Sequence, residues 1–502
     1  MRADARRLLV QVDPRSPDSI FKAAATAIRC GLVEEALPLA KHGTSAYPTD
    51  ARMWQVLGLA HRALEDSARA IDAFTKAARL APLDPLIAHS LARVTLEGGL
   101  PAVELFDRAR GLAPTDGSVL LGRTAALFAR GRIADAIADL DRLLDRHPGW
   151  TDGHATAARL RWMLGDRATF TSSFERASRA APREAAIWWG LVGTLMDAER
   201  YDDALDAIAR GRDAAGASRR FDAMEAACVA ESGTAGAADR LFASLVPFDD
   251  VGTVVRFVRH LLRSARPAEA AEIAEAWVGN DPADLLWPYL AAAWRMLGDP
   301  RWTWLEGNPR FVGVYDIGDK VGSLDALAQR LRALHLAVHQ PLDQSLRGGT
   351  QTDGPLFARM ELEIRALRTA IVDAVKTHVA QLPPRDPRHP LLKMPRAPIS
   401  FSGSWSVRLH AEGHHINHIH SAGWISSAFY VALPQAHMGG AGHAGWLSLG
   451  EVTELGLGLA PLRLIEPKPG RLVLFPSTMW HGTRPFAGGE RLTVAFDVAR
   501  GT

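Results

Sequence analysis

The sequence has little cysteine and no long apolar stretch, and each shortage excludes a class of protein. Cys30 and Cys228 are the two cysteines among 502 residues, too few for a disulfide framework, which favours a reducing cytoplasm. No apolar run reaches the roughly 20 residues that a membrane-spanning helix needs. The Leu8–Val10 run behind the basic N-terminus is too short for the core of a signal peptide. We therefore expect a cytoplasmic protein with no membrane partner.

An excess of charge of either sign is also missing. The chain has 58 Lys and Arg against 56 Asp and Glu, for a formal net charge of +2. Its arginines alternate with acidic residues along helical segments, which is typical of solvated helix faces. A nucleic-acid surface would instead concentrate Lys and Arg on one face. We expect no nucleic-acid partner.

Proline recurs with a nearly constant period in the N-terminal part. Pro48, Pro82, Pro114, Pro148 and Pro182 are separated by 34, 32, 34 and 34 residues. A period of 34 residues is the signature of the tetratricopeptide repeat. We expect residues 1–300 to form roughly eight such units, stacked into an α-solenoid with a concave groove.

The residues inside one unit support this assignment. In the unit that ends at Pro82, the small residues Gly58 and Ala70 let two helices approach closely, and Phe74 fills the space between units. Grooves of this kind commonly hold a peptide or a helix, so a protein or peptide partner is expected. The alternative is that the array only supports or dimerises the rest of the chain.

Residues 301–395 are expected to be a lead-in of helices and loops. Apolar residues recur at helical spacing over 323–338 and 355–382, which predicts two buttressing helices. The segment Arg347–Thr352 between them contains two glycines, which suit a turn or a close approach of two backbones. From its sequence this segment is predicted to be a loop.

The pattern changes to short strands over residues 396–502. The β-rich runs are separated by glycine-containing turns, which predicts an all-β barrel or sandwich behind the helical array. These runs are 404–411, 424–433, 446–450, 471–475 and 491–498.

Histidine is concentrated in this β-rich part. His418 and His420 are two residues apart, so on a strand their side chains share a face about 6–7 Å apart. Two such imidazoles can converge on one metal ion, and His481 from a distant strand would complete a facial set with open positions. On a strand without a bulge His414 would share this face, whereas His415 would lie on the other. The alternative is that these are ordinary polar residues of a barrel.

Arg491 follows His481 by ten residues on a predicted strand. A guanidinium can hold the carboxylate of a co-substrate through two parallel hydrogen bonds. Thr493 shares the strand face of Arg491 and could add a hydroxyl hydrogen bond. The alternative makes Arg491 a charge at a strand edge beside the Gly488–Gly489 turn.

Several motifs together resemble the 2-oxoglutarate/Fe(II) oxygenases of the double-stranded β-helix fold, over the region from residue 300 to the end. The segment Arg347–Thr352 resembles a subgroup that carries tetratricopeptide repeats in front of the oxygenase. The other motifs are Ser404–Arg408, His418–His420, Ile425–Val431, Pro469–Pro476, Trp480–Gly482 and Arg491–Phe496.

The resemblance implies a jelly-roll dioxygenase that uses Fe(II), 2-oxoglutarate and O2 to hydroxylate a protein or peptide delivered by the repeats. It implies iron ligation by His418, His420 and His481. The residues implied to bind 2-oxoglutarate are Arg491 and Thr493, with Tyr430 and Arg408 as further candidates. Arg347 or Gln351 would face the substrate at the lip of the active site.

One position departs from the family pattern. The usual triad is His-x-Asp/Glu followed by a distal His, and His420 stands where the carboxylate is expected. Three-His iron sites occur in other dioxygenases, so two alternatives stay open. One is a repeat scaffold with an inactive barrel, and the other is a three-His dioxygenase that oxidises a small molecule without 2-oxoglutarate. Arg491 with Thr493 argues against the second, because a directly coordinated substrate does not need that anchor.

Overall fold

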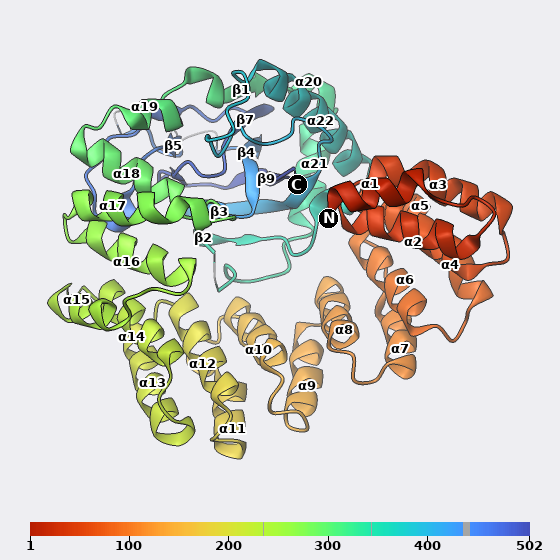
Figure 1. Ribbon diagram of the computed structural model, residues 1–502, viewed down its shortest axis with the longest axis horizontal. Helices are drawn as coiled ribbons and strands as arrows, with labels where there is room; N and C mark the ends of the chain where they lie inside the picture. The colour runs from red at the N-terminus through yellow and green to blue at the C-terminus, as the bar shows by residue number, and fades with distance from the viewer. Residues whose placement is uncertain (234, 343, 435–441, 502) are drawn as a thin grey trace.

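The computed structural model describes residues 1–233, 235–342, 344–434 and 442–501. Helices come first and strands follow, as the sequence predicted. The helices of the array form an arc around the strand-rich C-terminal part, so the oxygenase-like region sits inside the curve of the repeats (Figure 1).

The arc consists of antiparallel helix pairs. Its even-numbered helices α6 to α12 lie nearer the strands than their odd-numbered neighbours (Figure 1). The helices are α1 (Arg2–Val10), α2 (Pro17–Arg29), α3 (Val33–Ala46), α4 (Ala51–Ala63), α5 (Ser67–Leu80), α6 (Pro85–Glu97), α7 (Val103–Leu112), α8 (Gly117–Ala129), α9 (Ile133–Leu144), α10 (Thr151–Met163), α11 (Ser172–Ala180), α12 (Ala185–Asp197), α13 (Tyr201–Ala215), α14 (Arg219–Glu231), α15 (Ala235–Ser244), α16 (Val251–Arg263), α17 (Pro267–Trp277), α18 (Trp287–Leu297) and α19 (Arg301–Glu306).

The proline period has a structural cause in the turn between units. Two residues after the proline, Asp84 and Asp116 cap the next helix, accepting backbone N–H bonds from Leu86 and Ser118 at 2.8 Å. Six residues after Pro182, the indole of Trp188 donates to the proline carbonyl at 2.8 Å. The same bond joins the indole of Trp54 to the carbonyl of Pro48. The repeated residues therefore tie each unit to the helix that follows.

Small residues recur where aromatic rings need room. A Cβ added at Gly58 would lie 2.8 Å from the ring of Phe74, and one added at Gly122 would lie 2.2 Å from the ring of Phe106. Phe74 also clusters with Val94 of the next unit. The role assigned to these positions from sequence is confirmed.

The strands form one curled antiparallel sheet in the order β1-β7-β4-β9-β3-β8-β5-β6, with β2 paired to β3. All five predicted runs are strands, and four further short strands were not predicted. The strands are β1 (Gly313–Asp316), β2 (Leu346–Gln351), β3 (Phe401–His418), β4 (Gly423–Ala432), β5 (Leu447–Leu449), β6 (Arg463–Ile465), β7 (Arg471–Pro476), β8 (His481–Thr483) and β9 (Arg491–Ala499).

The segment predicted as a loop at Arg347–Thr352 is instead strand β2, and that prediction was wrong. Its pairing with β3 shifts register between Arg347 and Gly349. Gly348 has φ +67°, and a Cβ there would lie 3.0 Å from the Cα of Gly413. The glycines thus permit a bulge and a close backbone approach, and they hide the alternation that marks a strand.

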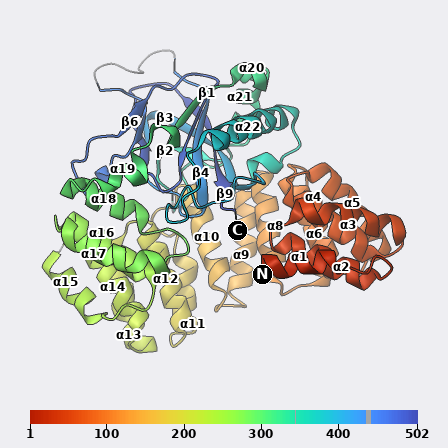
Figure 2. The same cartoon turned by 45° about the horizontal axis from the view of Figure 1, so that its top comes forward.

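Two lead-in helices, α21 (Leu324–Arg332) and α22 (Leu362–Gln381), cover one side of the sheet, as Figure 2 shows. Leu327, Ile371 and Val375 share a buried core with Leu472 and other strand residues. Helices were predicted here over 323–338 and 355–382, and both form over shorter spans. A short helix, α20 (Gly318–Val321), precedes them.

Both arms of the arc contact the oxygenase-like region. Near α18 the indole of Trp480 donates to the carbonyl of Pro288 at 3.1 Å. At the other arm the hydroxyl of Ser67 donates to the carbonyl of Ala358 at 2.6 Å, and Arg368 pairs with Glu65 at 3.0 Å. None of the described helices has the length and apolarity to cross a membrane.

A buried carboxyl at this junction makes stability depend on pH. Glu306 is 8 % exposed, and burial raises its pKa to about 7. The charged form is therefore penalised in the folded state, and stability falls as pH rises from 4.5 towards 7. We expect Glu306→Gln to raise the free energy of unfolding at pH 8 by up to about 3 kcal/mol, with the gain vanishing towards pH 4.5.

Melting temperatures of the parent and the variant between pH 5 and 8 measure this effect. Glu272→Gln, at an exposed position of α17, is the matched control and should change little at any pH. A Glu306→Gln gain that is the same at all pH values, or a loss at pH 8, would contradict the account.

Candidate metal and co-substrate site

Three histidines converge on one point at the ends of neighbouring strands. His418 ends β3 and is paired with His481, the first residue of β8, while His420 follows two residues beyond β3. The Nε2 atoms of His418 and His420 are 3.0 Å apart. One ring nitrogen of each histidine lies within 4.8 Å of those of the other two, and this is the cluster that could hold a metal ion among the described residues.

Hydrogen bonds fix which nitrogen of each ring faces the centre. His418 Nδ1 donates to the carbonyl of Ile416 at 2.8 Å, and His481 Nδ1 donates to the carbonyl of Met479 at 3.0 Å. With Nδ1 carrying the proton, Nε2 keeps its lone pair. The rings are thus oriented and tautomerised as metal ligands require.

Asp497 performs the same task for the third ring. Its carboxylate oxygens lie 2.7 and 2.8 Å from His420 Nδ1, and it also accepts the hydroxyl of Ser426 at 2.6 Å. The carboxylate missing from position 420 is therefore present one shell further out, where it orients His420 and raises its basicity as a ligand.

Sequence reasoning missed Asp497, although a signal was present. It is the single acidic residue in the mostly buried strand β9, and it lies six positions after Arg491 on the same strand face. It is 7 % exposed. An acid on the inward face of a buried strand needs a partner, and the unusual His420 is that partner.

Burial keeps two of the candidate ligand rings neutral. Burial first, and then the proximity of His420, lowers the pKa of His418 to about 3. Burial together with His418 holds the pKa of His481 well below its usual range. A neutral imidazole keeps the lone pair that a metal ion needs, so the burial of these two rings favours metal binding.

A bulge brings a fourth histidine to the same cavity. The pairing of β3 with β8 shifts register between His415 and His418. His415 therefore lines the cavity, with its Nδ1 3.2 Å from the Ser345 hydroxyl, while His414 turns to the carbonyl of Glu412. The faces expected of these two residues on an unbulged strand do not apply, because β3 is bulged.

Arg491 lies in the cavity as a buried cation that pairs with no carboxylate of the described residues. It is 3 % exposed, and its Nε and Nη1 make no hydrogen bond to any described residue. Its guanidinium carbon lies 5.1 Å from the ring centroid of the buried Tyr430, and burial lowers its pKa. An uncompensated buried charge is costly, so this arrangement fits an anionic ligand such as a carboxylate.

The other residues singled out from sequence divide into two groups. Thr493 and Gln351 line the cavity together with Arg491 and the three histidines. Arg408 and Arg347 are outside the cavity lining. Arg408 pairs with Glu490 at 2.5 Å, and Arg347 pairs with Glu199 of the array and donates to the carbonyl of Gln344 at 2.8 Å.

Comparison with known proteins agrees with this architecture. Residues 403–497 match a family model described as "Putative 2OG-Fe(II) oxygenase". Residues 21–85 and 101–149 match the tetratricopeptide repeat model. The chain therefore carries tetratricopeptide repeats and, behind them, a domain of the 2-oxoglutarate/Fe(II) oxygenase type, as its motifs predicted. That family implies Fe(II), 2-oxoglutarate and O2 as the reacting groups.

Similar solved structures are repeat proteins. YrrB, described as a TPR protein with an unusual peptide-binding site, is 18 % identical, with 34 % of this chain and 90 % of that chain covered and a TM-score of 0.28. MamA from Desulfovibrio magneticus RS-1 is 19 % identical over 32 % and 93 %, with a TM-score of 0.29. A repeat protein from Parabacteroides merdae is 13 % identical over 42 % and 82 %, with a TM-score of 0.30. No curated protein matches the chain.

The role of Asp497 can be tested on metal affinity alone. We expect Asp497→Asn to weaken binding of Co(II) or Fe(II) by about 10–100-fold, because such outer carboxylates hold the ligand ring and raise its basicity. Anaerobic titration of the full-length protein measures this. Asp316→Asn, at an exposed ion pair with Arg471, is the matched control. Unchanged affinity in Asp497→Asn would show that His420 does not depend on this carboxylate.

Proposed function

We propose that the protein is an Fe(II)- and 2-oxoglutarate-dependent dioxygenase that hydroxylates a protein or peptide substrate recruited by its repeat array. One observation carries the proposal: a buried arginine, for which the described residues offer no carboxylate partner, lies in the same cavity as three converging histidines. Three rings alone would fit many metal sites. The added cation supports a co-substrate with a free carboxylate, which 2-oxoglutarate has.

Each residue then has a task set by its position. His418, His420 and His481 would hold the iron, with their Nδ1 atoms occupied elsewhere. Arg491 would bind the far carboxylate of 2-oxoglutarate, assisted by the hydroxyl of Thr493. When bound, iron, 2-oxoglutarate and O2 supply the oxidising chemistry, which yields succinate, CO2 and a hydroxylated substrate.

The walls of the cavity would exclude water from the reacting groups. Phe475 packs against His481 with ring centroids 4.6 Å apart, and Leu447, Val407 and Trp405 complete the apolar lining. Tyr430 lies under the guanidinium of Arg491 and would keep it aimed at the cavity through a cation–π contact.

The two alternatives from sequence make different demands on Arg491. A direct three-His dioxygenase, or a scaffold with an inactive barrel, gives no reason to bury an unpaired cation beside the histidines. The energetic cost of that burial supports a function in which an anion arrives.

Substitution of the three candidate ligands should affect iron binding in different ways. We expect His418→Ala and His481→Ala to lose the single iron(II) that the parent binds, and His414→Ala, outside the cavity, to keep it. Because His420→Asp alone would set two carboxylates side by side, it is combined with Asp497→Asn. This double variant should retain iron, since it recreates the usual carboxylate position. The measurement is the iron content of each variant after anaerobic reconstitution. Full iron binding by both His418→Ala and His481→Ala would contradict the proposal.

The co-substrate prediction uses two arginines of the same sheet. Arg491→Met should raise the 2-oxoglutarate concentration needed for half-maximal succinate formation by roughly 30-fold or more, since truncating one partner of a buried charge pair costs about 2–5 kcal/mol. Iron should stay bound, because the arginine is not a ligand. Arg408→Met, outside the cavity, is the control and should behave as the parent. If Arg491→Met uses 2-oxoglutarate as the parent does, another residue must bind the far carboxylate of the co-substrate.

A further inference from the structure

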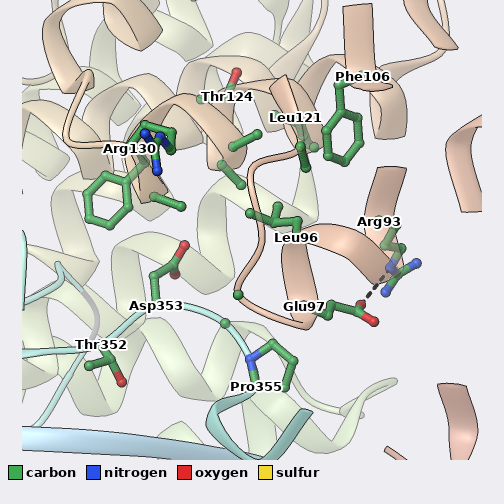
Figure 3. A pocket seen from close by; sticks show the side chains of 18 of the residues that line it. Arg93, Leu96, Glu97, Phe106, Leu121, Thr124, Arg130, Thr352, Asp353 and Pro355 are labelled. Atoms are coloured by element: carbon green, nitrogen blue, oxygen red, sulfur yellow. Dashed lines mark hydrogen bonds and ion pairs between the residues drawn. The ribbon is translucent and has the colours of Figure 1, made fainter. Parts of the chain in front are cut away.

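A large pocket lies between the inner face of the array and the lead-in of the oxygenase domain. It has a volume of ≈ 570 Å³. Helices α6, α8 and α10 form one wall, and the segments 333–336 and 352–359 form the other. Figure 3 shows Leu96, Leu121 and Phe106 on the array side and Thr352, Asp353 and Pro355 on the lead-in side.

The pocket keeps apolar side chains accessible in a concave place. Leu100 and Leu336, one from each wall, are 42 % and 37 % exposed. Leu96, Leu121 and Leu160 add to the apolar lining. Burying a Leu-sized side chain contributes about 1.5–3 kcal/mol, so a ligand with one such group would gain affinity here.

The pocket is linked to the metal cavity through a second, polar hollow. The hollow shares Arg159, Thr352 and Asp353 with the large pocket, and it shares Gln344 and Gln351 with the cavity at the histidines. The three hollows therefore lie next to one another and mark a path from the inner face of the array to the candidate ligands. The metal cavity itself is narrow, with a free volume of ≈ 50 Å³, so most of a large substrate has to lie along this path.

The charge of the pocket lining is positive. Four arginines face two carboxylates: Arg93, Arg130, Arg159 and Arg359 against Glu97 and Asp353. Glu97 is already paired with Arg62 and Arg93, and Asp353 is paired with Arg159 at 3.2 Å. Arg359 is paired with Glu361, which lies outside the lining. Arg130 is therefore the arginine of the lining that is left for a ligand. Arg130 makes no ion pair or hydrogen bond through its side chain to any described residue. The pocket therefore favours an acidic group beside the apolar one.

The polar lining of the hollow favours an extended peptide over an acyl chain as the ligand. An acyl chain that ran from the pocket to the histidines would bury the amide of Gln351 and the Arg159–Asp353 ion pair against hydrocarbon. Removing an amide and an ion pair from water in this way costs free energy. An extended peptide fits the order of the three hollows, which is apolar, then polar, then metal-binding. It offers an apolar side chain to the pocket, main-chain amides to the polar hollow, and a further side chain to the metal cavity.

We infer that this pocket is the recognition subsite for a polypeptide substrate, and that it takes a large apolar side chain adjacent to an acidic residue. The inference rests on the proposed function, whose substrate class it specifies. Selection of the substrate then takes place in the pocket, between the repeats and the lead-in, and the metal cavity receives only the side chain that reacts.

The test uses the full-length protein and three fluorescein-labelled peptide pools of equal length, followed by anisotropy. The first pool fixes Leu, Phe or Trp next to Asp or Glu, the second fixes the same apolar residues next to Lys or Arg, and the third fixes Ser next to Asp or Glu. We expect the first pool to bind about tenfold tighter than either of the others. Equal binding of all three pools, or displacement of the first pool by decanoate, would overturn the inference.

Matched variants locate the binding. Leu336→Asp should weaken the first pool about tenfold, and Arg130→Glu should weaken it and favour the second pool. Leu83→Asp and Arg79→Glu, at exposed positions of the array outside the pocket, should change neither. First-pool binding that survives Leu336→Asp and Arg130→Glu would place the peptide elsewhere and overturn the inference.

A parallel assay of succinate formation distinguishes failure of this inference from failure of the proposed function. Pocket-dependent binding of the first pool without Fe(II)-dependent succinate would reject the proposed function and leave the peptide subsite standing. Succinate formation by the parent together with pocket-independent binding would reject the subsite and leave the enzyme.

Discussion

The pairing of β3 is the constraint on which the candidate site depends. Over its first half β3 pairs with β9, which sets Arg491 opposite Leu409 and Thr493 opposite Val407. After the bulge it pairs with β8, which sets His418 opposite His481. A slip of one residue in either register would turn these side chains to the opposite face of the sheet. One strand thus brings together residues more than 60 positions apart in the chain.

Charge balance gives the unusual ligand set a physical explanation. In the usual triad a carboxylate ligand offsets part of the iron's charge. In the proposed site His420 would ligate instead, and Asp497, which is hydrogen-bonded to His420, would supply the negative charge. With Arg491 positive and 2-oxoglutarate doubly negative, the formal charges of Fe(II), Asp497, Arg491 and the co-substrate cancel. Within a buried cavity such cancellation matters, because isolated charges are costly there.

Much of the fold follows from the sequence, because its signals are periodic or local. The 34-residue proline period indicates the repeats, since the proline carbonyl or the aspartate cap after it is used again in several of the turns between units. The His-x-His pair and Arg491 could be found because alternation on a strand fixes their faces. β2 could not, because Gly348 and Gly349 hide its strand character. His415 reaches the cavity through a bulge that no local pattern indicates. Asp497 could be noticed as an acid in a buried strand, but its contact with His420 joins residues 77 positions apart and could not be read from a local pattern.

The central claim is that one cavity binds iron through three histidines and 2-oxoglutarate through iron and Arg491 together. Optical titration of the iron(II)-loaded, full-length protein with 2-oxoglutarate in the absence of O2 tests it most directly. A keto acid that chelates Fe(II) gives a visible charge-transfer band, so the account predicts a band that saturates at one 2-oxoglutarate per iron. Iron that binds with no band at any 2-oxoglutarate concentration would contradict it.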